Sequence, residues 1–485
     1  MTSADVSTIA AESEPLSRRA RSETVLALCL AWSASEPARV GEIAIVPSHG
    51  RALVVGRGDG DGSEARARFV RQRGGLITPA PPLEGEAISR RQLLLRSDGT
   101  GIEVENVGRA ALRINGERGQ TGRLAPGDVL VVGRQLVLYC VTRPARVPAA
   151  RHAGYPTGPF GEPDGCGLIG EAPAMWRLRD MIGFAAAAEA HALLLGESGT
   201  GKELTAQAIH DLSVRAGRAL VSRNAATLPA TLIDAELFGN LRNYPNPGMP
   251  ERKGLIGEAD GATLFLDEIG ELSAELQAHL LRVLDTKGEY QRLGESTTRR
   301  SSFRLIAATN RDASALKGDL LPRFTLHVEV PALAERREDI PLIARHLVLR
   351  AKSKAPSIVG RFVGAGDGRE EVRFDPHFVE QILRRSYPGN IRDLDGLIWR
   401  AMSESRADVI DPLHDESWAE PAAPAPARAP RRMTAADEPT VDAIREAMRG
   451  SAGSITEAAR ALGLPSRYAL YRLLRKHGIE VDRKA

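Results

Sequence analysis

The sequence predicts a chain of three folded parts: an all-β sandwich, a central α/β domain and a small all-α domain at the C-terminus. Its 485 residues exceed the length of one ordinary domain. Two stretches, 143–165 and 404–436, contain the Pro- and Ala-rich sequence of extended linkers. Apolar residues have strand-like spacing before the first stretch, alternate between strand and helix spacing after it, and are helical in spacing after the second. We therefore expect domain boundaries at both stretches.

The composition sets limits on location more than on function. A net charge of +3 does not by itself require a nucleic-acid partner. The three cysteines, Cys29, Cys140 and Cys166, lack the CxxC spacing of zinc sites, and their scatter fits a reducing compartment. The apolar run 25–32 follows four residues reading RRAR, as in a signal peptide, but it is short and leads into strand-like sequence. We expect a β-strand there, a cytoplasmic protein, and no membrane partner.

The N-terminal part divides into a tail and a β-rich domain. Residues 1–21 are small and polar, and we expect a disordered tail. Between 22 and 142, short runs of β-branched residues and leucine alternate with Gly, Asp and Asn, without helical periodicity. This pattern predicts a β-sandwich with strands at 43–46, 53–55, 92–95, 102–104, 111–114 and 129–132.

Four short motifs in this part resemble a forkhead-associated (FHA) domain: Gly56-Arg57, Ser89-Arg90-Arg91, Asn115-Gly116 and LAPGDVLVVG at 124–133. The resemblance implies a sandwich whose loops bind a phosphothreonine protein or peptide. By the same resemblance, the residues that contact the phosphate are Arg57, Ser89 and Arg90. Their side chains suit charge-assisted hydrogen bonding to a phosphate group.

The FHA resemblance is incomplete. Gln92 stands where the family usually has a structural histidine, and Ala110 where it usually has a peptide-contacting asparagine. The segment between Arg57 and Ser89 is also long. Two interpretations therefore stay open, a phosphopeptide sensor and a sandwich that has lost phosphopeptide binding.

A glycine-rich loop follows the apolar run 193–195 in the central part. Its glycines let backbone N–H groups converge on phosphate oxygens, and Lys202 can reach the terminal phosphates of a nucleotide. The generic pattern has Ser or Thr after the lysine, as a magnesium ligand, whereas this chain has Glu203. We expect ATP to bind at the segment Gly196, Glu197, Ser198, Gly199, Thr200, Gly201, Lys202 and Glu203.

A second apolar strand, TLFLDE at 263–268, ends in two carboxylates. A buried parallel strand would bring both carboxylates to the nucleotide crevice. Asp267 can hold Mg²⁺ through its oxygens, and Glu268 can orient or deprotonate the attacking water. We expect Asp267 to bear more of the metal binding than usual, because no hydroxyl follows Lys202.

Five segments together resemble the AAA+ central domain of bacterial enhancer-binding proteins, the activators of sigma-54 RNA polymerase. They are GESGTGKE (196–203), ELFG (236–239), ADGATLFLDEIGEL (259–272), RLIAATNRD (304–312) and YPGNIRDL (387–394). The resemblance implies an α/β ATPase with a helical lid over residues 166–403, with ATP and Mg²⁺ as cofactors. In this family, glutamate after the P-loop lysine is normal.

The same resemblance implies further roles. Asn224 matches an asparagine that holds the catalytic glutamate, Asn310 matches a sensor of the terminal phosphate, and Arg392 matches a second sensor in the lid. Arg323 matches an arginine finger that reaches the site of a neighbouring protomer, so catalysis would require a homo-oligomeric ring, usually a hexamer. Such an arginine stabilises charge on the transferring phosphoryl group.

One loop departs from the family. After ELFG the family normally carries GAFTGA, which contacts sigma-54, whereas this chain has Asn243, Tyr244, Pro245, Asn246, Pro247 and Gly248. The two prolines stiffen the loop and remove N–H donors. Two interpretations stay open: a loop that still contacts sigma-54 RNA polymerase, or an ATPase ring that acts on another partner.

The last part, 437–485, predicts two short helices with a tight turn between them. Residues 454–457 have capping-box spacing, Gly463 interrupts the helical pattern, and a basic helix follows at 467–476. The region 441–485 holds nine Lys/Arg and five Asp/Glu, a net charge of +4. It resembles the Fis-type helix-turn-helix, which works as a dimer on palindromic DNA. The expected DNA contacts are Arg467, Tyr468, Arg472, Arg475 and Lys476.

These observations lead to one interpretation of the whole chain and one alternative. The first is an ATP-hydrolysing, DNA-binding transcription regulator, in which an FHA-like sensor controls a sigma-54-activating ring at an enhancer-like site. The alternative is a DNA-bound regulator or repressor whose ring does not drive sigma-54.

Overall fold

The computed structural model describes residues 24–414, except 49, 61, 153, 228–232, 287, 311–315, 317 and 367–368, together with Ala447 and Leu462. The chain divides into two compact units, Met1–Ala419 and Glu420–Ala485. The predicted tail, the predicted helix-turn-helix and its five DNA-contact residues lie outside the described residues. Within the part of the chain that is described, no helix is long and apolar enough to cross a membrane.

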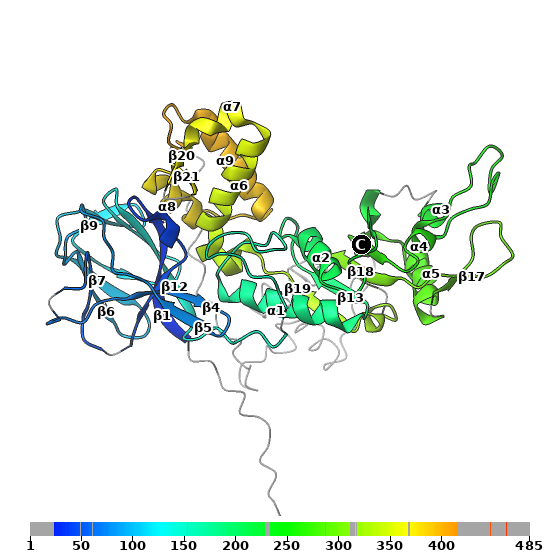
Figure 1. Ribbon diagram of the computed structural model, residues 1–485, viewed down its shortest axis with the longest axis horizontal. Coiled ribbons are helices and arrows are strands. Elements are labelled where there is room, and N and C mark those ends of the chain that lie inside the picture. The colour runs from blue at the N-terminus through cyan, green and yellow to red at the C-terminus, as the bar shows by residue number, and fades with distance from the viewer. Residues whose placement is uncertain are drawn as a thin grey trace, which may run out of the picture. The chain divides into compact units, whose positions relative to one another are not determined.

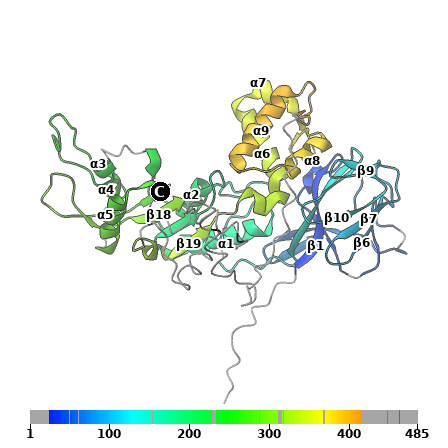
Figure 2. The same cartoon turned by 180° about the vertical axis from the view of Figure 1, so that it is seen from behind.

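The N-terminal part is a sandwich of two antiparallel sheets, drawn blue to cyan in Figures 1 and 2. One sheet has the strand order β5-β4-β2-β1-β12-β11-β8-β9 and the other β10-β7-β6-β3. The strands of the first are β1 (Thr24–Ser33), β2 (Ile43–Val46), β4 (Phe69–Arg73), β5 (Leu76–Pro79), β8 (Leu112–Ile114), β9 (Glu117–Gly119), β11 (Val129–Val132) and β12 (Leu136–Pro144). Those of the second are β3 (Leu53–Val55), β6 (Leu93–Ser97), β7 (Ile102–Asn106) and β10 (Thr121–Leu124).

This β-rich region confirms the predicted strands, each of which falls on an observed one. The apolar run 25–32, which resembles part of a signal peptide in sequence, lies in β1, a central strand of the larger sheet. The β4–β5 hairpin was not predicted. It lies in the long segment between Arg57 and Ser89 and extends the edge of the larger sheet beyond β2.

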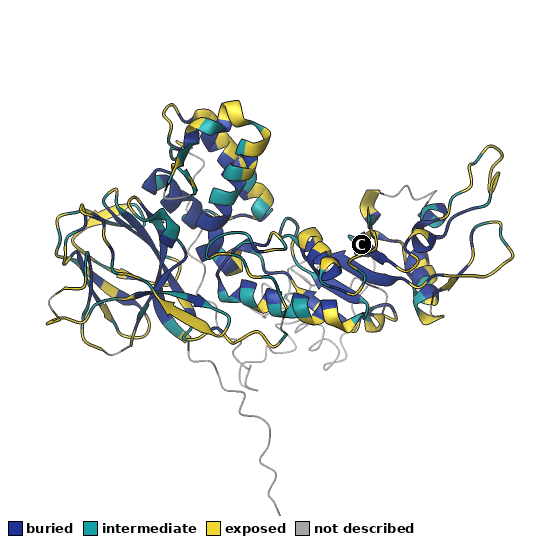
Figure 3. Cartoon of the chain, viewed as in Figure 1, coloured by how far each residue is buried: buried dark blue, intermediate teal, exposed yellow. Residues whose placement is uncertain are grey.

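In the middle of the larger sheet, β1, β11 and β12 are buried on both faces, and Figure 3 shows much of them in dark blue. Along β1, Leu26, Leu28 and Leu30 point into the core between the two sheets. The alternate residues Ala27, Cys29 and Ala31 point the other way and join a second core. Because side chains alternate along a strand, a run apolar on both faces needs a partner on each.

The central domain has a parallel sheet with the order β14-β15-β18-β13-β19, as the alternating pattern predicted. One face packs on α1 (Pro173–Ala188) and α2 (Lys202–Asp211), the other on α3 (Ile233–Phe238), α4 (Leu255–Glu258) and α5 (Ala274–Asp285). The strands are β13 (Ala192–Leu195), β14 (Leu220–Asn224), β15 (Thr263–Asp267), β18 (Arg304–Thr309) and β19 (Leu326–Glu329), and a small ribbon consists of β16 (Glu289–Tyr290) and β17 (Arg299–Arg300).

A helical lid follows the parallel sheet (yellow to orange in Figure 1). Its first turn is the 3₁₀ segment η6 (Leu333–Asp339). The lid contains α6 (Ile340–Lys354), α7 (Pro356–Val359), α8 (Pro376–Arg384), α9 (Ile391–Glu404) and the strand pair β20 (Val363–Ala365) and β21 (Glu370–Val372). The remaining 3₁₀ turns are η1 (Pro37–Arg39), η2 (Ala225–Thr227), η3 (Ile269–Glu271), η5 (Leu321–Arg323) and η7 (Gly360–Phe362).

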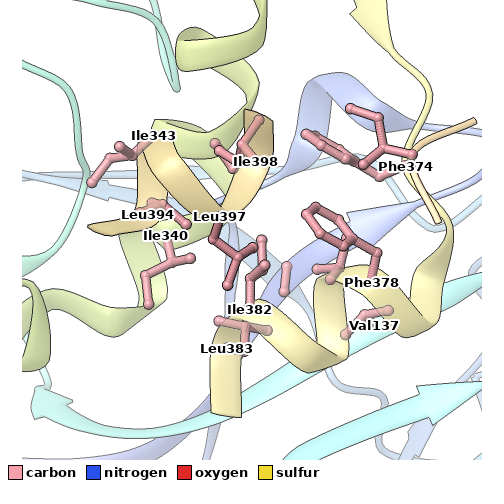
Figure 4. Close-up of a cluster of buried hydrophobic side chains, with 14 of the residues drawn as sticks. Val137, Ile340, Ile343, Phe374, Phe378, Ile382, Leu383, Leu394, Leu397 and Ile398 are labelled. Carbon is pink, nitrogen blue, oxygen red and sulfur yellow. The ribbon is translucent and has the colours of Figure 1, made fainter. Parts of the chain in front are cut away.

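The sandwich and the lid share one apolar core. Figure 4 shows Val137 of β12 beside Ile382, Leu383 and Phe378 of α8. At its margin, Arg143 Nη1 and Glu338 Oε2 form a buried ion pair of 3.2 Å. The sandwich is therefore packed directly on the lid through an apolar core.

The segment 143–165, predicted to be an extended linker, runs along this junction. Gly75 N donates to Val147 O at 3.0 Å, and Arg73 Nη1 donates to Gly158 O at 2.8 Å. Arg345 of the lid pairs with Glu162 at 2.9 Å. The inserted β4–β5 hairpin supplies the sandwich side of these contacts.

Candidate nucleotide site

The glycine-rich loop joins the end of β13 to the start of α2, as the motif predicts. Gly199 and Gly201 have φ angles of 76° and 106°, which residues with a Cβ adopt at a cost. Lys202 is buried, and its ammonium donates to Gly196 O at 2.9 Å and Glu197 O at 3.0 Å. The lysine is thus held over its own loop, where the phosphates of a nucleotide would lie.

The two predicted carboxylates lie at the end of β15, which is separated from β13 by β18 in the parallel sheet. Asp267 ends β15 in register with Asn224 at the end of β14, and Asn224 Nδ2 lies 3.5 Å from Asp267 Oδ2. Glu268 has a φ of 51°, in the left-handed region, and its Oε2 accepts from Asn310 N at 3.4 Å. The contact of Asn224 is therefore with Asp267, the residue next to the predicted catalytic glutamate.

The carboxylates Asp267 and Glu268 fit a magnesium ion. Among the described residues there is no cluster of three or more His, Cys, Asp or Glu side chains that could enclose a metal. Mg²⁺ commonly uses one or two carboxylates, with water and substrate phosphates completing its coordination. One or two carboxylates beside a phosphate loop have the donor chemistry that such an ion requires.

The lid contacts the loop directly. Arg392 Nη1 donates to Ser198 Oγ at 3.2 Å, so the predicted second sensor reaches the P-loop. Asn390 and Arg336 also contact the P-loop, at Ser198 O and Thr200 O. Neither residue was assigned a role from the sequence. Asn390 stood inside the quoted motif YPGNIRDL, which was a signal that could have identified it.

The predicted arginine finger lies away from these residues. Arg323, in η5, is half-exposed, and its Nε pairs with Asp285 Oδ1 at 2.6 Å. An exposed arginine on the domain surface is available to a second molecule once this pair opens.

Three ionisable residues are buried behind the loop, on η6. Burial lowers the pKa of Arg336 and raises the pKa of Glu338. Burial, reinforced by the neighbouring Glu338, raises the pKa of Asp339 to about 7. Asp339 Oδ1 accepts from the backbone N–H groups of Glu171 at 2.7 Å and Ala172 at 3.0 Å. These bonds tie the lid to the segment that precedes α1.

The loop at 243–248, where this chain differs from the family sequence, is held in place by neighbouring residues. The Asn240 amide donates to the carbonyls of Leu241, Tyr244 and Pro250 at 2.9, 3.1 and 2.9 Å. The Tyr244 ring is packed so closely on Gly294 that a Cβ there would lie 2.6 Å from it. Asn243, Tyr244, Asn246 and Gly248 nevertheless remain exposed at the tip.

A separate hollow on the sandwich contains two of the three predicted phosphopeptide residues in its wall. Arg57 and Arg90 line it together with Arg66 and Arg91. Arg66 Nη2 donates to the carbonyls of Arg57 at 3.2 Å and Arg90 at 2.9 Å, which fastens the two loops together. Sequence reasoning did not identify Arg66.

Ser89 is positioned beside this hollow by Gln92. Its N–H donates to Gln92 Oε1 at 3.2 Å, while Gln92 Nε2 donates to Asn106 Oδ1 at 2.7 Å and Ala110 O at 3.0 Å. Gly56 allows the close approach, because a Cβ there would lie 2.2 Å from Arg90 O. A buried glutamine thus organises the loop at the position where the FHA family has histidine.

A parallel sheet with a P-loop after β13, two carboxylates at the end of β15 and a helical lid defines a P-loop ATPase of the AAA+ class. Comparison with known families agrees. The sigma-54 interaction domain matches residues 168–324, and the AAA+ ATPase lid domain matches residues 334–417. The chain belongs to the family of transcriptional regulators that contain the sigma-54 interaction domain.

Several known proteins are similar to this chain in sequence over much of their length. The transcriptional regulatory protein ZraR of Salmonella typhimurium is 36% identical over 320 residues, covering 64% of this chain and 68% of that protein. The anaerobic nitric oxide reductase transcription regulator NorR of Aeromonas salmonicida is 35% identical over 357 residues, covering 68% and 67%. Among solved structures, NtrX from Brucella abortus in complex with ADP is 29% identical, with a TM-score of 0.45 over 65% of this chain and 70% of that one.

Proposed function

We propose that this protein hydrolyses ATP at the P-loop site and uses the energy to remodel closed promoter complexes of sigma-54 RNA polymerase. The observation that carries the proposal is the meeting of Lys202, Asp267 and Glu268 at one end of the parallel sheet, with Arg392 over them from the lid. Lys202 binds the terminal phosphates, Asp267 holds Mg²⁺, and Glu268 orients the attacking water. Magnesium, when bound, neutralises charge on the phosphates.

Glu268→Gln tests the hydrolysis step. The amide keeps the shape of the side chain but cannot take a proton, so ATP turnover should fall while ATP still binds. Phosphate release and binding of a fluorescent ATP analogue measure the two effects. Turnover like that of the wild type would remove Glu268 from the proposed role.

We place the arginine finger, Arg323, in the site of a neighbouring protomer of a ring, following the family resemblance. Its exposure and its pairing with Asp285, rather than with a residue of the P-loop, support this role. Arg323→Ala should lower ATP turnover by about a thousandfold without changing ATP affinity. Turnover should recover in part when the variant is mixed with Lys202→Ala protein, since each supplies what the other lacks. No recovery, with a ring present by sedimentation, would contradict the shared site.

An alternative is a ring that hydrolyses ATP without driving sigma-54. The observation that favours it is the loop at 243–248, which is pinned by Asn240 and by packing of Tyr244 on Gly294. A reconstituted open-complex assay with sigma-54 RNA polymerase, ATP and enhancer DNA distinguishes the two. ATP hydrolysis without open complexes supports the alternative, and open complexes lost in Tyr244→Ala support the first proposal.

The sensor and the DNA-binding part complete the proposed function. The arginine-lined hollow beside Ser89 is a site for a phosphothreonine protein or peptide. The C-terminal residues 437–485 bind an enhancer-like DNA site as a dimer, since their basic final helix suits the major groove. Electrophoretic mobility shift with the full chain and with Arg472→Ala tests the DNA part, and equal binding to every DNA sequence would contradict it.

A further inference from the structure

Asn390, the residue before α9, has a conformation that needs an explanation. Its φ of 55° and ψ of −129° are uncommon for a residue with a side chain. Such a conformation is strained and persists only where surrounding contacts enforce it. The side chain is buried, yet it does not cap its own helix as asparagine commonly does at this position.

The side chain of Asn390 instead joins the P-loop to the start of the lid. Its Nδ2 donates to Glu197 Oε2 at 2.9 Å and to Ser198 O at 3.0 Å. Its Oδ1 accepts from Leu333 N at 2.7 Å. The orientation of the amide is unambiguous, because Leu333 N can only donate and Ser198 O can only accept.

Two further lid donors continue this arrangement along the loop. Ile391 N donates to Gly199 O at 3.2 Å, and Arg336 Nη2 donates to Thr200 O at 3.0 Å. The backbones meet closely here, because a Cβ on Gly199 would lie 2.3 Å from Gly389 O. The carbonyls of Ser198, Gly199 and Thr200 are thus held in sequence by Asn390, Ile391 and Arg336.

Holding these carbonyls fixes the N–H groups that would bind phosphate. In a planar trans peptide the C=O and the following N–H point in opposite directions. Lid contacts to three consecutive carbonyls therefore direct the N–H groups of Gly199, Thr200 and Gly201 away from the lid contacts. Within the described part of the chain, these three groups donate to no protein acceptor. They remain free for an anion at the start of α2.

We propose that Asn390 is a positioning residue for the ATPase reaction, which sets the Ser198–Gly199 peptide so that the P-loop binds the nucleotide phosphates. The proposal rests on the proposed function only in requiring that the P-loop binds ATP. Asn390 acts through the loop and touches no reacting atom. Arg336 sets the Thr200–Gly201 peptide in the same way.

Asn390→Asp is the sharpest test, because it preserves size and the bond from Leu333 N. The new carboxylate cannot donate to Ser198 O and faces the carboxylate of Glu197. ADP affinity should fall about tenfold or more, as expected for losing a hydrogen bond to a charged partner. The affinity for adenosine, which has no phosphate, should stay within about twofold. Competition against a fluorescent ADP analogue on the full-length protein measures both.

Two companion variants separate positioning from folding. Glu197→Gln combined with Asn390→Asp restores a donor opposite the new carboxylate and should recover much of the ADP affinity. Asn390→Gly removes the amide and the acceptor of Leu333 N but relieves the positive φ, so it should still fold and should bind ADP weakly. Ser403→Ala, on the exposed face of the same helix, is the matched control and should bind as the wild type does.

The outcomes are distinct. Wild-type ADP affinity in both Asn390→Asp and Asn390→Gly overturns the proposal while leaving ATP hydrolysis intact. Equal loss of ADP and adenosine affinity also overturns it, because the effect would then be on the whole site. Failure of the wild type to bind ADP overturns the proposed function and this inference together.

Discussion

The molecule contains two candidate phosphate sites of opposite design. In the central domain, the phosphate would meet backbone N–H groups at the start of α2, with Lys202 as the one cation of the loop. On the sandwich, it would meet arginine side chains from separate loops, among them Arg57, Arg66 and Arg90. The first site depends on the path of the backbone, and the second on which side chains the loops bring together.

The support behind the two sites differs as well. Charged residues, Arg336, Glu338 and Asp339, are buried behind the P-loop, whereas the neutral amide of Gln92 is buried behind Ser89. Buried charges make a site sensitive to pH and to the loss of one partner. A neutral amide gives the same positional control without a titration.

The largest expected effect tests the backbone site. Lys202→Ala removes the one cation that the loop itself provides, so ATP turnover should fall by about a thousandfold. Phosphate release at saturating ATP measures it. Circular dichroism should remain that of the wild type, because the hydrogen bonds that the lysine ammonium makes to described residues go to carbonyls of its own loop. Residual turnover above a tenth of wild type would show that the loop binds phosphate mainly through its N–H groups.

The next largest effect concerns Asp339, one of the buried ionisable residues of η6. Asp339 ionises near pH 3.8 when unfolded and at about 7 in the fold, so the fold favours its protonated form. This contribution to stability is complete below pH 3.8 and is lost as pH rises to about 7. Asp339→Asn keeps an oxygen for the two backbone donors and has no proton to lose. From pH 5 to 8 the wild type should therefore lose up to ~3 kcal/mol relative to the variant.

Urea unfolding of both proteins at each pH measures that difference. Glu338 remains in both proteins, but it interacts with Asp339, so the difference reports the titration of Asp339 as coupled to Glu338. A difference that does not change between pH 5 and 8 would contradict the assignment of the pKa shift to Asp339.

A smaller effect is expected at the side-chain site. Arg57→Ala removes one of several arginines from the hollow, so affinity for a phosphothreonine peptide should fall about tenfold. Isothermal titration with phosphorylated and unphosphorylated peptides measures it, and Arg118→Ala, exposed on β9, is the matched control. Absence of peptide binding in the wild type would favour a sandwich that has lost this activity.

The smallest effect is expected at an ion pair between the sandwich and the lid. Arg134 is largely exposed, and its Nη2 lies 2.8 Å from Oδ2 of the buried Asp375. Arg134→Ala should change the free energy of unfolding by less than ~1 kcal/mol, because the arginine is open to water and Asp375 still accepts from His377 N. Denaturant unfolding measures it. A loss well above that value would mean that ion pairs, rather than the apolar core, hold the two parts together.

The comparison also explains what could be predicted from the sequence. The P-loop and the strand ending in Asp267 follow fixed spacings, because a strand, a tight turn and a helix dictate them. Arg66 and Asn390 were missed because their partners are distant in sequence, and no local spacing encodes such a contact. The contact of Asn224 with Asp267 likewise depends on the register of two strands that are joined by a long connection.

The packing of the sandwich on the lid could not be predicted from the sequence for another reason. A strand that is apolar on both faces, such as β1, has the same composition whether its second face meets a lid, a helix or another molecule. Only the fold reveals that Ala27, Cys29 and Ala31 meet α8 and its neighbours.

That shared core bears on how the protein can be divided in the laboratory and in evolution. A fragment ending near residue 142 would expose to water the apolar face formed by Ala27, Cys29, Ala31, Val129, Val131, Val137 and Tyr139. Such a fragment should aggregate or dimerise through that face. Replacing the sandwich by another domain should therefore require compensating changes in the faces of α6, α8 and α9 that it covers.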